Sequence, residues 1–226
     1  MSDIPSKSAG RQAAEDSVVA IVSAIPVIGA IATPFLVSEL TRRHSEKRDS
    51  WLNDLERRLV QLQNEGTVNL DSLFNNEKFL ELVYFAIQQG QATLNDEKHK
   101  LLSNVVINYS QNLSMDDDKK YIFMKYIEEF TPSHIALLKL QSEPKKYYEL
   151  AQIPWPNLSM GGRSQIISGA FTAWNSEFIS LLFEDLKTAG LIQSAPLGGT
   201  MSGSGLEQPL STALGREFLV FVEPSI

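Results

Sequence analysis

The sequence predicts a mainly α-helical protein, in which an N-terminal helical bundle precedes a C-terminal winged-helix-like domain with a small β-wing. Apolar residues recur at helical spacing through the first 130 residues, where no alternating strand pattern occurs. The last hundred residues add three helices, a short apolar strand, a glycine-rich loop and a closing apolar segment. We therefore expect a flexible N-terminus (1–16), the bundle (17–130) and the winged-helix-like domain (131–226).

Composition limits the possible functions. The 226 residues are 43% hydrophobic and 21% charged, which suits one large or two small domains with real cores. The absence of cysteine excludes disulfides, thiolate metal sites and cysteine nucleophiles, and is typical of a cytoplasmic protein. The net charge of -7 disfavours nucleic-acid binding unless basic groups gather on one face.

One apolar stretch, residues 17–38, contains no ionisable side chain. As a helix it would reach about 33 Å, enough to cross a bilayer core of about 30 Å. Two prolines and a glycine interrupt it, so we expect a helix over 11–25, an irregular turn and a new helix beginning near Pro34. Its length and the acidic residues before it argue against a cleavable signal peptide. It is either a buried hairpin within the bundle or a membrane segment.

A polar run, TRRHSEKRDS at residues 41–50, follows the apolar stretch. A helix that is polar on every side must lie in water or beside a charged surface. Basic residues directly after an apolar run are also typical of cytoplasmic membrane flanks, although a solvated helix face gives the same pattern. The candidate membrane or partner contacts are Val18, Ile21, Ile25, Pro26, Ile28, Gly29, Pro34, Arg42, Arg43, Lys47 and Arg48.

Helical spacing and capping residues define the rest of the bundle. The expected elements are a helix from Trp51 that ends at Gly66, a one-turn connector over 70–74, an amphipathic helix over 79–90, a helix capped by Asn95, and a helix that Asp116–Asp118 begin and that runs to Phe130.

The C-terminal domain begins with a Thr131-Pro132 cap. The expected elements that follow are a first helix, a second helix over 146–152, an insertion over 154–169, a third helix over 174–189, a strand over 191–193, a loop (PLGGTMSGSG) too rich in glycine for one shape, and a closing strand at FLVFV. In the third helix, Phe178, Leu181, Leu182 and Leu186 are expected to face inward. Its acidic outer face, the candidate site for a protein partner, is expected to consist of Glu177, Glu184 and Asp185.

Two segments, LLFEDLKTAGLI and LSTALGREFLVFV, resemble the third helix and the returning strand of winged-helix domains. The apolar N-terminus together with EKHKLLSNVVIN, FTPSHIALLKL and LGREFLVFV resembles bacterial proteins that pair a helical bundle with a winged-helix-like end. The layout is also similar to that of the abortive-infection alpha family of phage-resistance proteins. The resemblance implies a bacterial cytoplasmic protein with a role in defence, and it transfers no catalytic residue.

Signatures of DNA reading and of catalysis are weak. The third helix is acidic and the glycine-rich loop lacks Lys and Arg, which argues against a DNA-reading surface. Gly198 and Gly203 have the spacing of a phosphate-binding loop, but Ser204 stands in place of its lysine. His44, His99 on an expected exposed face, and His134 lack ligand spacing. We expect no catalytic residue, metal or cofactor.

Two functions remain. The first is a non-enzymatic effector or adaptor that acts through a protein partner, self-association or contact with the inner membrane. The second is a winged-helix transcriptional regulator whose bundle dimerises or senses a signal. The acidic third helix favours the first.

Overall fold

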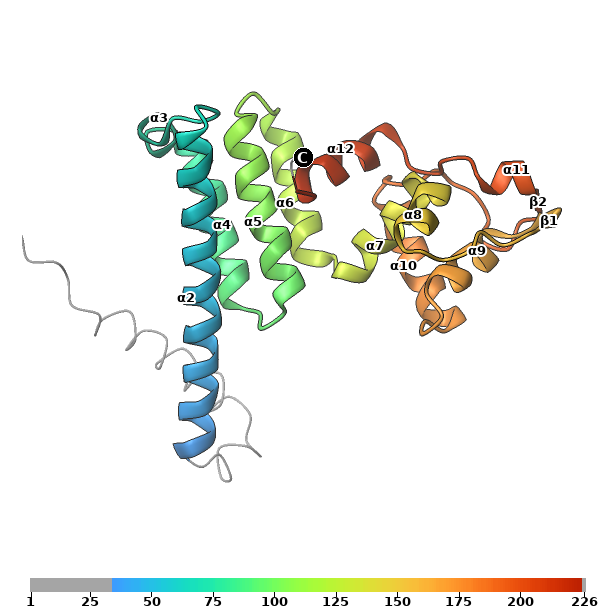
Figure 1. Cartoon of the computed structure of the whole chain (residues 1–226), viewed down its shortest axis with the longest axis horizontal. Coiled ribbons are helices and arrows are strands. Elements are labelled where there is room, and N and C mark those ends of the chain that lie inside the picture. The colour runs from blue at the N-terminus through green and yellow to red at the C-terminus, as the bar shows by residue number, and fades with distance from the viewer. Residues whose placement is uncertain (1–33, 225–226) are drawn as a thin grey trace, which may run out of the picture. The chain divides into compact units, whose positions relative to one another are not determined.

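A computed structural model of the chain describes residues 34–224, with side chains from residue 42 onward. The expected helix over 11–25 lies outside these residues. The described chain is mainly helical, with eleven helices and one two-stranded sheet between residues 34 and 224 (Figure 1). The described residues form two compact units that divide between Ser103 and Asn104, inside helix α5 (Asp96–Gln111).

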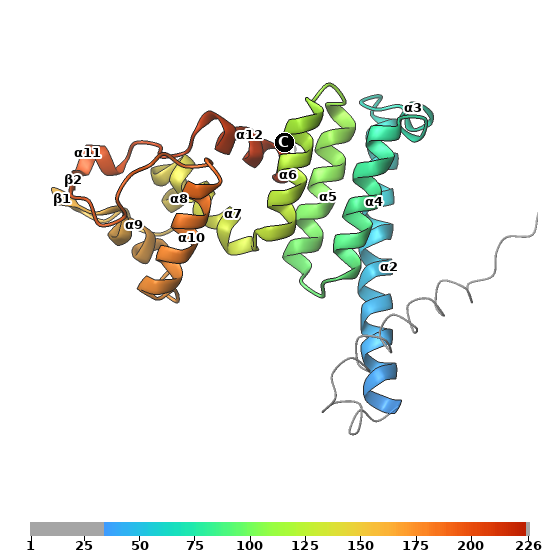
Figure 2. The same ribbon diagram turned by 180° about the vertical axis from the view of Figure 1, so that it is seen from behind.

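The first unit consists of three long helices and one short one, α3, in the expected order. Its elements are α2 (Pro34–Asn64), α3 (Leu70–Phe74), α4 (Glu77–Gln91) and the first half of α5. The expected helix from Pro34 is therefore present, and it runs without a break through the polar run into the helix expected from Trp51. Figures 1 and 2 both show α2 extending beyond α4 at its N-terminal end.

Local signals set the ends of these helices as expected. Gly66 follows α2 with a φ of 73°, a left-handed conformation that glycine adopts without strain. Asn95 begins α5, since its side-chain oxygen accepts hydrogen bonds from the backbone amides of Glu97 (2.9 Å) and Lys98 (3.1 Å).

Trp51 of α2 lies at the centre of the first unit and is 6% exposed. Its indole nitrogen donates a 2.7 Å hydrogen bond to Ser103 Oγ, and its ring stacks on His99 at 5.3 Å between centroids. The expectation that His99 is exposed is wrong, because it is 5% exposed and its Nε2 donates to the Gly90 carbonyl over 2.9 Å. Because lysines flank His99 in the sequence, its position suggested a solvent-exposed face, but the imidazole ring is buried.

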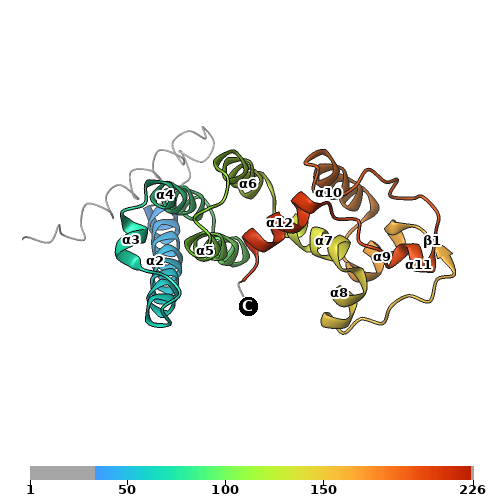
Figure 3. The same ribbon diagram turned by 90° about the horizontal axis from the view of Figure 1, so that it is seen from above.

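The second unit contains shorter helices. Its elements are the second half of α5, α6 (Asp117–Glu129), α7 (Pro132–Ser142), α8 (Pro144–Leu150), β1 (Met160–Gly161), α9 (Arg163–Ala170), α10 (Ser176–Thr188), β2 (Met201–Ser202), α11 (Gly203–Leu206) and α12 (Ala213–Val222). The expected caps are present: Asp116 Oδ1 accepts from the Lys119 amide, and Thr131-Pro132 opens α7. Figure 3 shows α7 between α12 and α8 in the view from above.

The insertion over 154–169 contains β1 and most of α9. Two expectations for this unit are wrong. The glycine-rich loop has a defined fold, because β2 pairs antiparallel with β1 and α11 follows it. The closing FLVFV segment belongs to helix α12 rather than to a strand.

The closing segment is helical for a local reason. Thr212 caps it, with Oγ1 accepting from the Gly215 amide over 3.0 Å. Phe218, Phe221 and Val222 are buried, whereas Val220 is 74% exposed. A strand with Phe218 and Val222 buried would bury Val220 as well, so the pattern of exposure is that of a helix.

A short antiparallel hairpin stem connects α10 to α12. Ile192 and Ser211 form an isolated bridge, and the Gln193 amide donates to the Leu210 carbonyl over 2.8 Å. The expected strand over 191–193 is thus present only as one side of this stem.

Helix α12 packs against α6 through aromatic rings. The Phe218 ring lies 5.2 Å from that of Phe123, 5.7 Å from that of Tyr126 and 6.2 Å from that of Phe130. The Asn108 side-chain amide donates to the Val220 and Phe221 carbonyls at the end of α12. These contacts lie within the second unit, which begins at residue 104.

Gln141 of α7 is fully buried, and neither its side-chain oxygen nor its nitrogen has a hydrogen-bond partner among residues 34–224. A buried amide without partners loses its hydration and gains nothing in return. We expect Gln141→Met to raise the free energy of unfolding by about 1 to 2 kcal/mol, because methionine fills a similar volume without polar atoms. A urea titration followed by circular dichroism measures this change.

The matched control is Gln88→Met on the exposed side of α4, which should leave stability unchanged. A loss of stability in Gln141→Met would mean that the amide makes an interaction in solution that compensates its burial.

Candidate functional site

Helix α10 carries the residues that the sequence predicts for partner contact. Asn175 begins it by accepting a 2.8 Å hydrogen bond from the Phe178 amide. Its buried side chains are Ile179, Leu182, Phe183 and Leu186. The expectation that Leu181 faces inward is therefore wrong, because the buried stripe is rotated by one residue and leaves Leu181 57% exposed.

The three predicted acidic residues do not share one environment. Glu177 and Glu184 are exposed and lie seven residues apart, which places them on the same side of α10. Glu184 also forms an ion pair with Lys187. Asp185 is half-buried, and its carboxylate accepts a 3.2 Å hydrogen bond from His134 of α7.

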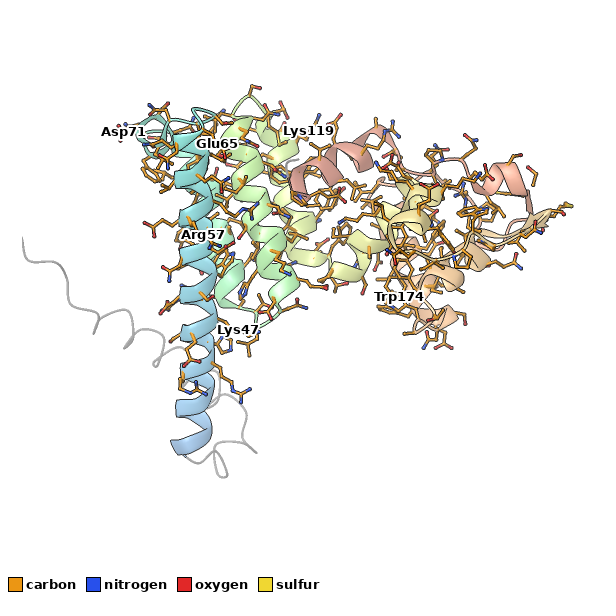
Figure 4. The ribbon with its side chains drawn as sticks, in the orientation of Figure 1. Lys47, Arg57, Glu65, Asp71, Lys119 and Trp174 are labelled. Carbon is orange, nitrogen blue, oxygen red and sulfur yellow. The ribbon has the colours of Figure 1, made fainter. Side chains whose placement is uncertain are left out.

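Half-buried aromatic rings continue the exposed side of α10 beyond its N-terminal end. The Trp174 ring stacks on Phe171 at 3.8 Å between centroids and meets the edge of Phe178 at 5.5 Å. Trp174 is labelled in Figure 4. We define the α10 face as the side that displays Trp174, Glu177, Phe178, Leu181 and Glu184, an apolar surface with carboxylates along it.

A pocket of about 360 Å³ lies in the second unit between α6, the start of α7 and the end of α10. Its lining residues are Lys125, Tyr126, Glu129, Phe130, His134, Asp185, Thr188 and Ala189. Sequence analysis singled out only His134 and Asp185 among them. No sequence signal indicated that α10 lies beside α6 and α7, because about forty residues separate it from them in the chain.

Aromatic rings form one wall of this pocket. Phe130 stacks between Tyr126, at 5.3 Å, and His134, at 4.7 Å. The Tyr126 hydroxyl donates a 2.8 Å hydrogen bond to the Ala189 carbonyl, which joins α6 to the end of α10. Burial, and secondarily the charge of Glu129, raises the pKa of Tyr126, so the phenol stays protonated as this bond requires.

The His134 ring joins two neighbours in a chain that superficially resembles a catalytic triad. Its Nδ1 lies 2.9 Å from Thr131 Oγ1, and its Nε2 lies 3.2 Å from Asp185 Oδ2. Nδ1 also accepts a 3.1 Å hydrogen bond from the backbone amide of Thr131. This is the bond of a capping box, in which the side chain of the third helical residue, here His134, binds the amide of the N-cap residue. The ring therefore fixes the start of α7 and directs its Nε2 proton to Asp185.

The basic run lies in α2, where its cations already have partners. Arg42 pairs with Glu46 over 2.7 Å, and Arg48 with Asp49 over 2.8 Å. Lys47 reaches the Leu94 carbonyl over 2.9 Å and Asp96 over 2.7 Å, and Figure 4 shows it beside the α4–α5 turn. This hydrogen bond and the charge of Lys47 lower the pKa of Asp96.

The other predicted contacts from Val18 to Gly29 lie outside the described residues, and Pro34 is the first residue of α2. From residue 34 to residue 224, no helix is both long and apolar enough to span a bilayer.

Arg163 at the start of α9 is a buried cation, 2% exposed. Its guanidinium donates to the carbonyls of Leu206 (3.2 Å), Gly205 (3.2 Å) and Gln208 (2.6 Å), and burial lowers its pKa. It therefore holds the end of α11 and the residues directly after it in place. The described residues contain no group of three or more His, Cys, Asp or Glu side chains that could hold a metal.

Comparison of the chain with protein-family models, with curated proteins and with solved structures finds no match.

Proposed function

We propose that this protein is a non-enzymatic effector or adaptor that acts through protein contact, and that the α10 face is its contact surface. The observation that carries the proposal is Leu181, which is 57% exposed between Glu177 and Glu184. Burial of exposed apolar surface favours association, aromatic rings contribute most strongly, and flanking carboxylates select a partner of opposite charge. The matching partner is a segment with both apolar and basic side chains.

We also propose that residues 131–226 are winged-helix-like. The supporting observation is the hairpin stem after α10, where residues 191–193 run antiparallel to residues 210–212. The pairing of β1, which lies between α8 and α9, with β2 inside the loop adds to this support. Helix α12 then follows the stem, where a simple winged helix would end.

The hairpin also favours the second candidate, a transcriptional regulator in which α10 reads DNA. Electrostatics weigh against it, because α10 presents Glu177 and Glu184, and the ammonium group of Lys187 is neutralised by Glu184. Recognition helices need cations or amides that reach phosphates and base edges. Membrane association through the apolar stretch and a role in phage defence remain predictions.

Site-specific photocrosslinking tests the adaptor proposal. The photoreactive residue p-benzoylphenylalanine is placed at Leu181 of the full chain, or at Leu150 as a control that is 77% exposed elsewhere in the same unit. In cells of the source organism, we expect a discrete protein adduct from position 181 only. Mass spectrometry should locate the crosslink in a segment rich in basic and apolar residues. Glu177→Lys in the same chain should reduce the adduct several-fold.

Two results would contradict the proposal. One is an adduct at position 181 that is no stronger than at position 150, or that is insensitive to Glu177→Lys. The other is a micromolar complex with random-sequence duplex DNA that weakens steeply with salt, since counterion release would then show phosphate contact and favour the regulator.

A further inference from the structure

The pocket beside α10 has the charge and shape of a receptor for a cation. Asp185 uses Oδ2 to accept the bond from His134, and no hydrogen bond to its Oδ1 occurs within residues 34–224. Among the described residues, Glu129 makes one long ion pair, with Lys125, at 3.7 Å between Nζ and Oε1, which is too far for a hydrogen bond. Both carboxylates therefore retain acceptor capacity in the pocket.

The backbone adds to this negative character. The last turn of α10, including Thr188, lines the pocket, and the C-terminal end of a helix carries partial negative charge. Among the lining residues, Lys125 carries one positive charge, and Glu129 and Asp185 each carry one negative charge. With His134 counted as neutral, the net charge of the lining is -1.

The aromatic wall favours a planar cation. Phe130 is covered on both faces by the nearly parallel rings of Tyr126 and His134, so a planar cation could stack only on these two terminal rings. A guanidinium group can stack on such a ring while its N–H groups reach carboxylates. An ammonium group has no plane to stack and makes a single compact contact. The volume of about 360 Å³ lies at the lower end of the range for small-ligand sites.

We propose that this pocket binds the guanidinium group of an arginine side chain from the partner that contacts the α10 face. The proposal rests on the proposed function, because α10 contributes to both surfaces: Leu181 and Glu184 to the face, Asp185 and Thr188 to the pocket. Asp185 is the main ligand, and His134 is a positioning residue that orients its carboxylate.

The test uses the full chain and N-acetyl-arginine amide, with amide NMR shifts as the readout. We expect millimolar binding that shifts the backbone amides of Tyr126, Asp185 and Ala189 in a saturable way. N-acetyl-lysine amide should bind at least threefold more weakly. Asp185→Asn, which keeps the shape and an acceptor for His134, should weaken arginine binding at least fivefold. Glu184→Gln, one residue earlier on α10 and outside the lining, should not change it.

Several outcomes would overturn the proposal: no saturable shift at 50 mM probe, equal binding of the lysine probe, or equal affinity in Asp185→Asn with an unchanged thermal midpoint. Free arginine, whose α-groups are charged, distinguishes a side chain from a small-molecule ligand. Binding of free arginine more than tenfold tighter than the blocked amide would exclude the partner side chain as ligand. If the arginine probe binds but the crosslink at position 181 fails, the pocket is a guanidinium site and the proposal that the α10 face contacts a protein partner is wrong.

Discussion

Gly215→Ala is expected to destabilise the second unit by about 3 kcal/mol or more, because the new methyl group has no space. A Cβ at Gly215 would lie against the Leu191 carbonyl oxygen and 2.9 Å from its carbon. The neighbour is backbone, so no side-chain rotation can relieve the overlap.

The Leu191 carbonyl also has little freedom to move. It accepts the backbone amide of Thr212 over 2.9 Å, and the Leu191 amide donates to the Leu186 carbonyl over 3.0 Å. Accommodation of the methyl group would therefore break the junction between the hairpin stem and α12. Urea denaturation followed by circular dichroism measures the loss.

The matched control is Gly198→Ala. A Cβ at Gly198 would meet no atom within 4 Å, so its stability should stay within about 0.5 kcal/mol of wild type. Similar stabilities of the two variants would mean that the close approach of α12 to Leu191 is absent in solution.

Helix positions were largely predictable from the sequence because their signals are local. Asn95, Asp116 and Thr131 each begin a helix as expected, and Gly66 and Gly190 follow helix ends with left-handed φ values of 73° and 70°. Helical spacing similarly located α4, where Phe79, Leu82 and Ala86 are buried.

The errors arose where a local pattern fits two structures. Aromatic and β-branched residues in FLVFV suit a strand, but the Thr212 cap and the rings of α6 favour a helix. The glycine-rich loop lacks apolar periodicity, and buried Arg163 binds the carbonyls of Gly205, Leu206 and Gln208 where the loop ends. Such tertiary contacts leave no trace in nearby sequence.

The candidate site was predictable only in part. Acidic residues on α10 were evident from helical spacing, whereas the exposure of Leu181 depends on a one-residue rotation of the buried stripe. The pocket depends on residues from three helices, and the bond between His134 and Asp185 spans fifty-one positions. Long-range pairs of this kind follow from packing rather than from spacing.

Trp51→Ala is expected to be the most damaging single truncation in the first unit, with a loss of about 3 to 5 kcal/mol. The indole is 6% exposed, so its removal leaves a large cavity. It also takes away the donor to Ser103 Oγ and the ring that stacks on His99. The indole ring also packs directly against the backbone of Gly90, where an added Cβ would lie only 2.6 Å from the ring.

Two further variants separate the causes of this loss. Trp51→Phe keeps most of the ring but not the hydrogen bond, so it should cost less than the truncation to alanine, about 1 to 3 kcal/mol. Val60→Ala on the same helix, where Val60 is 43% exposed, should stay within about 0.5 kcal/mol of wild type. Far-ultraviolet circular dichroism is the appropriate signal, because Trp155 and Trp174 also contribute to fluorescence. If Trp51→Ala unfolds at the same denaturant concentration as Val60→Ala, Trp51 does not anchor α2 against α4 and α5.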